Sequence, residues 1–303
     1  MKISIIIVNY NTKEITRQCL DSIFKWTRDI DFEVVVVDNN STDGSKEMLS
    51  LYPNIKYIQS GENLGFGKAN NLGYKYSCGR YILLLNSDTY LLNNAIKLFA
   101  DAFDKLPHDV GCVGCKLKSP DGSFNHSFGL IPDLKGAMYG IIGLYCRPWG
   151  MRFKRFNERD YDDINQLEVE YVMGADLCIR REIVEQCGLF DPDFFMYYEE
   201  SEMQYRYRTA GYKSVIVSGP EIVHLECVST KADGKKYSYR NRKMFFESYK
   251  LYMKKRYSWY KYMLFRMIFV FQFPIFFASY YTLKESLSMI ALLFTPVRPD
   301  IHE

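Results

Sequence analysis

An apolar run near residue 85 stops abruptly at three polar side chains, Asn86, Ser87 and Asp88. The run, Ile82–Leu85, is typical of a strand that is buried on both faces, as in parallel sheets. Open α/β sheets bind their ligands at the carboxyl ends of such strands. The Asp88 carboxylate suits a hard divalent cation, which prefers oxygen ligands and often shares them with substrate phosphates. For this segment alone, a polar residue that merely closes a strand is the competing interpretation.

Two earlier apolar runs also end in polar clusters. Asn9–Asn11 follows the run Ile3–Val8, and Asp38–Ser41 follows the run Phe32–Val37. The carboxyl ends of parallel strands share one edge of a sheet, so the three clusters are predicted to converge. Capping of the next helix is the alternative for any single cluster, because Asn, Asp and Ser are favoured N-caps. Asp38 is well placed to accept hydrogen bonds from a nucleobase.

A third kind of polar group is the acidic cluster Glu199, Glu200 and Glu202, which follows the bulky segment Phe194–Tyr198. Carboxylates at a helix start are favoured by the helix dipole and are often structural. Crowding beside apolar side chains should raise the pKa of at least one of them, which suits a general base. His224, beyond the next expected strand, is either a metal ligand or a packed histidine.

The glycine-rich segment Gly61–Lys68 resembles a phosphate-binding loop at first sight. It is not a Walker A motif, because the spacing is one residue too long and Ala69 replaces the required Ser or Thr. Glycines that enter a helix could still present backbone N–H groups to an anion.

Composition is that of an ordinary globular protein, with 48% hydrophobic and 25% charged residues. The net charge of +3 is unevenly spread: Lys231–Lys261 holds eleven Lys or Arg and two acids, a local +9, which leaves −6 for the rest. This asymmetry argues against a nucleic-acid-binding protein. The pair Cys112 and Cys115 lies on an apolar, strand-like segment with no second pair, so structural thiols in a reducing cytosol are predicted.

Strand and helix patterns alternate through the first half of the chain, which predicts an α/β fold with a mostly parallel, Rossmann-like sheet flanked by helices. The first residues, MKISIIIVNYN, are expected to form a strand and not a signal peptide. An Asp-Gly pair within Ser119–Ser123 predicts a tight turn, and residues 124–168 are expected to be long loops. The remaining expected strands are Ile55–Gln59, Tyr81–Leu85, Val110–Leu117, a strand from Glu170 to about Cys178, and Ser214–Val217; the expected helices are Glu14–Lys25, Ser45–Leu51, Phe66–Tyr76, Asn93–Lys105, a short one from Arg181, and Glu199–Ala210.

Seven segments in order resemble the inverting nucleotide-sugar glycosyltransferases of family 2, which have the A-type fold. The segments are IIIVNYN, VVVDNNSTDGS, ENLGFGKANNLG, YILLLNSDT, YVMGADLCIRR, GLFDPDFFMYYEESEMQYR and a following His. The resemblance covers about Lys2 to Thr230. Within that family it looks closest to the rhamnosyltransferase-like branch, which builds bacterial surface polysaccharides.

The resemblance implies roles for individual residues. Glu200, with Glu199 beside it, matches the catalytic base, and Asp88 and His224 match the ligands of a metal, Mn2+ or Mg2+. The family's D-x-D is Asn86-Ser87-Asp88 here, which leaves one carboxylate for the metal, and its Glu-Asp dyad is Glu199-Glu200, so either glutamate can act. Nucleotide-sugar contacts are implied for Asn9, Tyr10, Asp38, Asn40, Lys68, Asn86 and Ser87, and the sugar or acceptor pocket for Gly174, Ala175 and Asp176.

The expected function is metal-dependent inverting transfer of a sugar from a UDP- or dTDP-sugar donor to a glycan or lipid-linked acceptor hydroxyl. A sugar diphosphate needs a cation as the leaving group departs, and the acceptor needs a base on the opposite face. A nucleotidyltransferase and a non-catalytic nucleotide-sugar-binding protein are the alternatives. Release of nucleoside diphosphate, of pyrophosphate, or of neither distinguishes the three.

Residues 1–230 are expected to form the catalytic domain, and residues 231–303 a basic, aromatic-rich helical extension. The apolar stretch Met267–Tyr281 is shorter than the about 20 residues of a spanning helix. Basic and aromatic residues side by side favour attachment to an anionic membrane surface, so a cytoplasmic protein, peripheral at the inner face of the membrane, is predicted. The alternative is a helical hairpin packed on the catalytic domain or on a second subunit of a homodimer.

Overall fold

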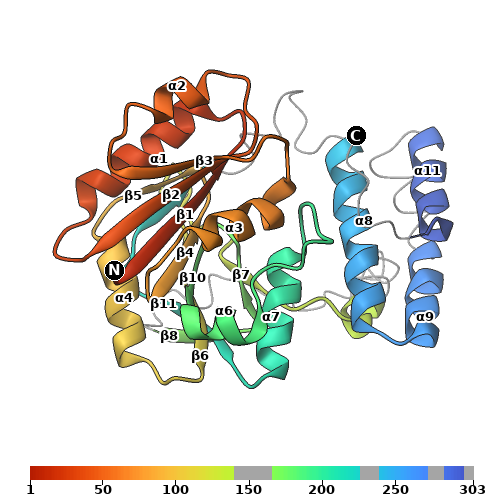
Figure 1. The fold of residues 1–303 in the computed structure, drawn as a ribbon. Helices are drawn as coiled ribbons and strands as arrows, with labels where there is room; N and C mark the ends of the chain where they lie inside the picture. The colour runs from red at the N-terminus through yellow and green to blue at the C-terminus, as the bar shows by residue number, and fades with distance from the viewer. Residues whose placement is uncertain (140–165, 226–238, 272–282, 297–303) are drawn as a thin grey trace.

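A central sheet organises the first three quarters of the chain in a computed structural model that describes residues 1–139, 166–225, 239–271 and 283–296. The eight described strands of this sheet run in the order β3-β2-β1-β4-β10-β6-β11-β8 (Figure 1). Their bounds are β1 (Ile3–Asn9), β2 (Phe32–Asp38), β3 (Ile55–Gln59), β4 (Tyr81–Leu85), β6 (Val110–Cys115), β8 (Gln166–Val169), β10 (Asp176–Arg180) and β11 (Lys213–Val217).

The predicted mostly parallel sheet is confirmed. β1 pairs in parallel with both β2 and β4, whereas β10 lies antiparallel between β4 and β6. Two small sheets accompany it, one of β5 (Thr89–Leu91) with β12 (Ile222–His224) and one of β7 (Phe128–Gly129) with β9 (Tyr171–Val172). The predicted single strand from Glu170 to about Cys178 is wrong, because the chain divides into β9 and β10 there.

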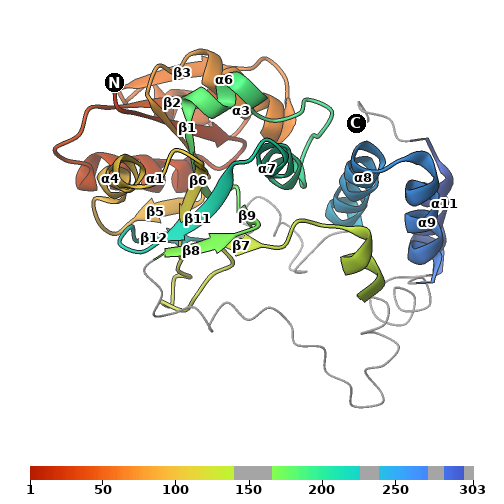
Figure 2. The same ribbon diagram turned by 90° about the horizontal axis from the view of Figure 1, so that it is seen from below.

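Helices cover both faces of the sheet, and side chains of β1 alternate between the two cores. Ile5 and Ile7 pack with one set of helices, α1, α2 and α4, whereas Ile6 packs with the other set, α3, α6 and α7 (Figures 1 and 2). This alternation follows from the two-residue period of a strand. The bounds are α1 (Lys13–Trp26), α2 (Ser45–Leu49), α3 (Gly65–Lys75), α4 (Ala95–Lys105), α6 (Arg181–Cys187) and α7 (Glu199–Thr209), each within about two residues of its predicted position.

Three further helices follow, α8 (Tyr239–Arg256), α9 (Trp259–Val270) and α11 (Leu283–Phe294); α8 lies on the side of α7, and α9 and α11 lie beyond α8 (Figures 1 and 2). They form a third core, which also takes in Ile131 and Phe194 from the sheet-bearing part. Part of the expected loop region 124–168 forms β7, a helical turn at 134–139 and β8, and residues 140–165 lie outside the described residues. In the described part of the chain, no helix has the length and apolar character needed to cross a membrane.

The turn predicted at Ser119–Ser123 is present. The Ser119 N–H donates to the Ser123 carbonyl at 2.7 Å, and Gly122 takes the positive φ of 80° that glycine adopts without strain. Cys112 and Cys115 are buried free thiols in β6, and burial raises the pKa of each, as expected of structural cysteines.

Candidate active site

The polar ends of β1, β2 and β4 meet at one edge of the sheet, as predicted. Asn9 is the register partner of Asp38, and its Nδ2 donates to Asp38 Oδ1 and to Ser41 Oγ, both at 2.9 Å. Thr12 Oγ1 lies 3.3 Å from Ser87 Oγ, which joins the third cluster to the first two. We call this set, residues 9–12, 38–41 and 86–88, the strand-end edge.

Within the strand-end edge, inner residues are tied to one another and outer residues reach solvent. Asp38 is fully buried, and its carboxylate accepts hydrogen bonds from Asn9, from the Ser41 N–H at 3.3 Å and from the Tyr57 hydroxyl at 3.4 Å. Tyr10 is 41% exposed and Asn40 is exposed with a φ of 66°. The structure therefore places Tyr10 and Asn40 where a ligand can reach them, with Asn9 and Asp38 behind.

The glycine-rich entry to α3 serves a close backbone contact. A Cβ at Gly65 would stand 2.3 Å from the Phe195 carbonyl oxygen, and the Phe66 N–H donates to that oxygen at 2.7 Å. The Gly65 N–H itself donates to Asn63 Oδ1 at 3.0 Å. These N–H groups have protein acceptors, so the predicted anion-binding role is not supported for them. Lys68 is half-buried on the first turn of the same helix.

Asp88 and His224 lie together although 136 positions separate them. β5 pairs antiparallel with β12, with His224 opposite Thr89, and the Leu225 N–H donates to the Asp88 carbonyl at 2.9 Å. His224 Nε2 is 3.3 Å from Asp88 Oδ1, and the two side chains are only 14% and 16% exposed. The short sheet therefore delivers an imidazole and a carboxylate to one point beside the strand-end edge.

Gly174, Ala175 and Asp176 run along the inside of the same edge. The Asn86 N–H donates to the Ala175 carbonyl at 3.0 Å, and Gly174 lies against the Phe66 ring. Asp176 is fully buried, its Oδ2 accepts from the Cys115 N–H at 2.7 Å, and its Oδ1 has no hydrogen-bond partner among the described residues. Burial raises the pKa of Asp176 to about 6.

The acidic cluster occupies the first turn of α7. Burial, with the neighbouring Glu200 charge, raises the pKa of Glu199 well above its usual range, and burial also raises the pKa of Glu200. Glu199 Oε2 has no hydrogen-bond partner in the described part of the chain. Glu202 instead pairs with Arg206, at 2.7 Å, and is structural. Two carboxyls with raised pKa values suit proton transfer near neutral pH.

Two features of the surrounding backbone bear on the position of the two glutamates. Gln204, a turn further along α7, binds the Val172 backbone with both ends of its amide, each at 2.8 Å, and so fixes the helix against β9. Tyr197 and Tyr198 precede the glutamates with φ of 72° and 68°, a left-handed conformation that is costly for aromatic residues. Such strain persists only where surrounding contacts hold it.

Aromatic contacts from α8 hold this turn. Tyr198 stacks on Tyr249 with ring centroids 5.0 Å apart and planes at 15°, and it meets Phe245 at 4.9 Å. Tyr197 meets the same Phe245 ring at 5.5 Å. The C-terminal helices therefore support the turn from which the glutamates start.

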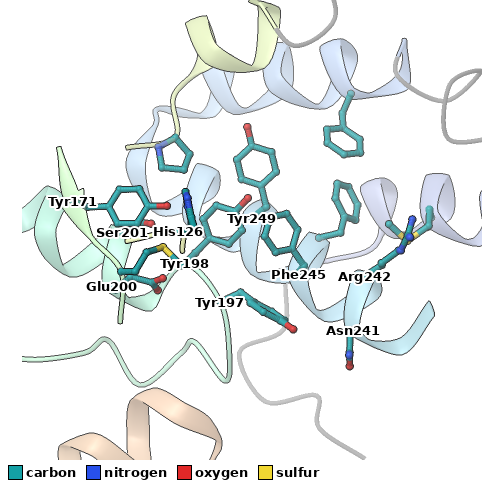
Figure 3. A pocket seen from close by; sticks show the side chains of 15 residues that line it. His126, Tyr171, Tyr197, Tyr198, Glu200, Ser201, Asn241, Arg242, Phe245 and Tyr249 are labelled. Carbon is teal, nitrogen blue, oxygen red and sulfur yellow. The ribbon is translucent and has the colours of Figure 1, made fainter. Parts of the chain in front are cut away.

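Glu200 also faces a cavity of about 720 Å3 between α7 and the C-terminal helices (Figure 3). Glu200 and His126 lie at one end and Arg242 at the other, with Tyr198, Phe245 and Tyr249 between them. The lining includes none of the strand-end edge. α3 passes directly beside the acidic pair, because a Cβ at Gly67 would be 3.8 Å from Glu199 Cβ.

His126 and Arg242 were not predicted from the sequence as residues of this region. His126 follows a turn in a stretch without a clear period, and its positive charge would lower the pKa of Glu200. Arg242 lies in the basic stretch, where nothing distinguishes it from its neighbours. The sequence contains only an indirect signal for the cavity, namely the aromatic residues that are interleaved with the basic ones in this stretch.

Comparison with known proteins agrees with this architecture. The model of the family described as "Glycosyl transferase family 2" matches residues 4–188. An N-acetylglucosaminyl-diphospho-decaprenol L-rhamnosyltransferase of Mycobacterium tuberculosis is 29% identical over 215 residues, which is 66% of this chain and 68% of that protein. The low-salt glycan biosynthesis hexosyltransferase Agl10 of Haloferax volcanii is 28% identical over 219 residues, 68% of this chain and 61% of that protein.

Solved structures share the fold at lower identity. S. aureus TarS 1-349 in complex with UDP-GlcNAc has a TM-score of 0.58 at 19% identity, with 96% of this chain and 79% of that chain covered. The mannosyltransferase PcManGT from Pyrobaculum calidifontis has a TM-score of 0.55 at 16% identity, with coverage of 97% and 85%. With a family model that matches more than half of its length and a fold shared with glycosyltransferases, the chain belongs to glycosyl transferase family 2, as its motifs predicted.

Proposed function

We propose that this glycosyltransferase moves a sugar from a UDP- or dTDP-sugar to a hydroxyl of a glycan or lipid-linked acceptor in bacterial surface polysaccharide synthesis, with inversion at the anomeric carbon. The observation that carries the proposal is the contact of His224 Nε2 with Asp88 Oδ1 at 3.3 Å beside the strand-end edge. Glu200, at the wall of the cavity, adds a candidate base. The rhamnosyltransferase relative acts, by its name, on a lipid-linked sugar, which supports this class of acceptor.

Asp88 and His224 fit a divalent cation, Mn2+ or Mg2+. Two neighbouring ligand atoms of an octahedral ion lie about 3 Å apart. His224 Nε2 and Asp88 Oδ1 are separated by 3.3 Å. The Asp88 carboxylate is of the ligand type that suits both ions, and a neutral imidazole such as that of His224 is a common metal ligand. Among the described residues no three His, Cys, Asp or Glu side chains gather as a closed metal site, so donor phosphates and water would fill the other positions. A cation there would neutralise the charge that develops on the departing diphosphate.

Glu200 would act as the base. Its carboxylate accepts the proton of the acceptor hydroxyl as that oxygen bonds to the anomeric carbon, and the bond from this carbon to the nucleoside diphosphate breaks on the opposite face. One base and one displacement invert the configuration. Glu199, which is more deeply buried and whose pKa burial raises well above its usual range, is the alternative base. Tyr10, Asn40 and Lys68 would contact the nucleotide, with Asn9, Asp38, Asn86 and Ser87 holding the edge in place.

The test is product analysis with a panel of nucleotide sugars and Mn2+ or Mg2+. Release of nucleoside diphosphate together with a glycosylated acceptor supports the proposal, whereas release of pyrophosphate identifies a nucleotidyltransferase, and binding without turnover identifies a non-catalytic binder. Asp88→Ala should abolish the metal-dependent reaction and keep the far-ultraviolet circular dichroism of the parent. Full activity of that variant would exclude Asp88 as the metal carboxylate.

We also propose that α9 rests on the inner surface of the membrane. One of its faces carries Tyr260, Leu264, Met267 and Phe271, at helical spacing and 46–64% exposed. The exposed Lys261 lies on the same helix, so apolar and cationic groups together match an anionic lipid surface. Flotation with anionic and with neutral liposomes tests this: salt-sensitive binding to anionic liposomes is expected, whereas a dimer without liposome binding would make the face a subunit interface.

A further inference from the structure

The cavity beside Glu200 has chemically different ends. Glu200, in the acidic pair that begins α7, lies at one end and Arg242, from α8, lines the other. Its volume of about 720 Å3 lies within the range of small-ligand sites, about 300–1,000 Å3. We propose that it binds the acceptor as a glycosyl phosphate, with the reacting hydroxyl at Glu200, the sugar ring along the aromatic wall and the phosphate at Arg242. This assignment rests on the proposed function.

The aromatic wall fits a sugar ring. Tyr198, Phe245 and Tyr249 lie between the two ends of the cavity in Figure 3, and their rings contact one another at centroid distances of 4.9 and 5.0 Å. Large rings that are held by their neighbours supply contact area at little loss of side-chain freedom. Phe245 is 49% exposed, so part of this surface is open to a ligand.

The charges fix the direction in which such an acceptor binds. An Arg guanidinium is planar and pairs with phosphate oxygens through two parallel hydrogen bonds. The Glu200 carboxylate at the other end would repel a phosphate and accept the hydrogen of a hydroxyl. A glycosyl phosphate is therefore held with its phosphate away from the base and a ring hydroxyl toward it. The catalytic glutamate and the anion-binding arginine come from α7 and α8, so the C-terminal helices complete the acceptor site.

Two matched probes test the inference: N-acetyl-α-D-glucosamine 1-phosphate and methyl N-acetyl-α-D-glucosaminide, which lacks the phosphate. Isothermal titration calorimetry on the full chain should give at least about tenfold tighter binding of the phosphorylated probe. Arg242→Gln should remove that preference and leave the methyl glycoside unaffected. Arg240→Gln is the control, because Arg240 is an exposed residue of the same helix that does not line the cavity.

The outcomes separate this inference from the proposed function. If the phosphorylated probe binds no tighter than the methyl glycoside, or if Arg240→Gln and Arg242→Gln behave alike, the acceptor site does not select a phosphate and the inference is wrong, even where the donor panel shows sugar transfer. If Arg242→Gln alone loses the preference but no nucleotide sugar is turned over, the binding site stands and the proposed function fails.

Discussion

The strand-end edge and the cavity beside Glu200 are built by different means. At the strand-end edge, parallel pairing sets the positions, so Asn9 and Asp38 are register partners and their side chains bond at 2.9 Å. Beside Glu200, the turn that precedes α7 lies outside the described strands, and Tyr197 and Tyr198 have φ values of 72° and 68°. There the positions depend on aromatic rings that α8 supplies from some 50 residues further along the chain.

This difference has an energetic side. A left-handed non-glycine residue costs about 1–3 kcal/mol, and an aromatic pair contributes about 0.5–1.5 kcal/mol beyond its buried area. The contacts of Tyr197 and Tyr198 with α8 are of the size needed to offset the strain. The strand-end edge is therefore held by its own hydrogen bonds, whereas the acidic turn is held by side chains of α8. Substitutions in α8 should consequently affect catalysis.

The largest effect is expected at the acidic turn itself. Glu200→Gln removes the proposed base and should lower kcat about 10²–10⁴-fold, the usual worth of general acid–base catalysis, with donor affinity retained. The measurement is steady-state transfer with a donor found in the panel, together with donor binding by calorimetry.

Glu199→Gln is the matched control for that loss. Glu199 is 4% exposed and does not line the cavity, so Glu199→Gln should lower kcat less than Glu200→Gln does. A large loss in Glu199→Gln with a small one in Glu200→Gln would assign the base to Glu199.

The second prediction concerns pH. A base must be ionised to act, and burial raises the pKa of Glu200 above the usual glutamate value near 4.3. Activity should therefore fall about tenfold for each pH unit below that raised pKa. A His126 cation lowers the pKa of Glu200, so His126→Ala should move the acid limb of the kcat profile to higher pH. An unchanged limb in His126→Ala would remove His126 from the electrostatics of the base.

The strand-end edge could be predicted from sequence because its signals are local. Apolar runs that stop at Asn9, Asp38 and Asn86 identify parallel strands and place their polar ends together by topology alone. The contact between Thr12 and Ser87 is one result. The surroundings of Asp38 could not be predicted fully, because its buried carboxylate accepts hydrogen bonds from donors on Asn9, Ser41 and Tyr57.

The cavity could be predicted only in part. The pKa rise of the glutamates was expected from the bulky residues before them, and the structure agrees. The other wall of the cavity comes from α8, and no periodic pattern in the sequence pairs Tyr249 with Tyr198. The choice between a tail packed on the catalytic domain and one on a membrane was also open. The structure shows that α8 packs on the catalytic part, through Tyr249 and through the ion pair of Lys255 with Asp191 at 2.7 Å, while one face of α9 stays exposed.

Tyr249 tests the claim that α8 holds the acidic turn. Tyr249→Ala removes the ring that stacks on Tyr198, and the loss of about 0.5–1.5 kcal/mol should lower kcat by about two- to tenfold if that energy positions Glu200. Tyr249→Phe keeps the ring and should stay near the parent enzyme. Circular dichroism and thermal unfolding establish that both variants fold. Equal kcat for Tyr249→Ala and the parent would mean that the turn holds itself.

The smallest effect is expected furthest from the chemistry, on the exposed face of α9. Leu264 is 46% exposed, and burying its remaining surface in lipid is worth about 1 kcal/mol, so Leu264→Ser should weaken binding to anionic liposomes by about three- to tenfold. Leu51→Ser is the matched control, because Leu51 is 74% exposed but follows α2 on the sheet-bearing part. With a water-soluble acceptor both variants should turn over like the parent, since neither residue touches the strand-end edge or the cavity. Equal liposome binding by both variants would show that the basic residues alone, and not this apolar face, bring the protein to the membrane.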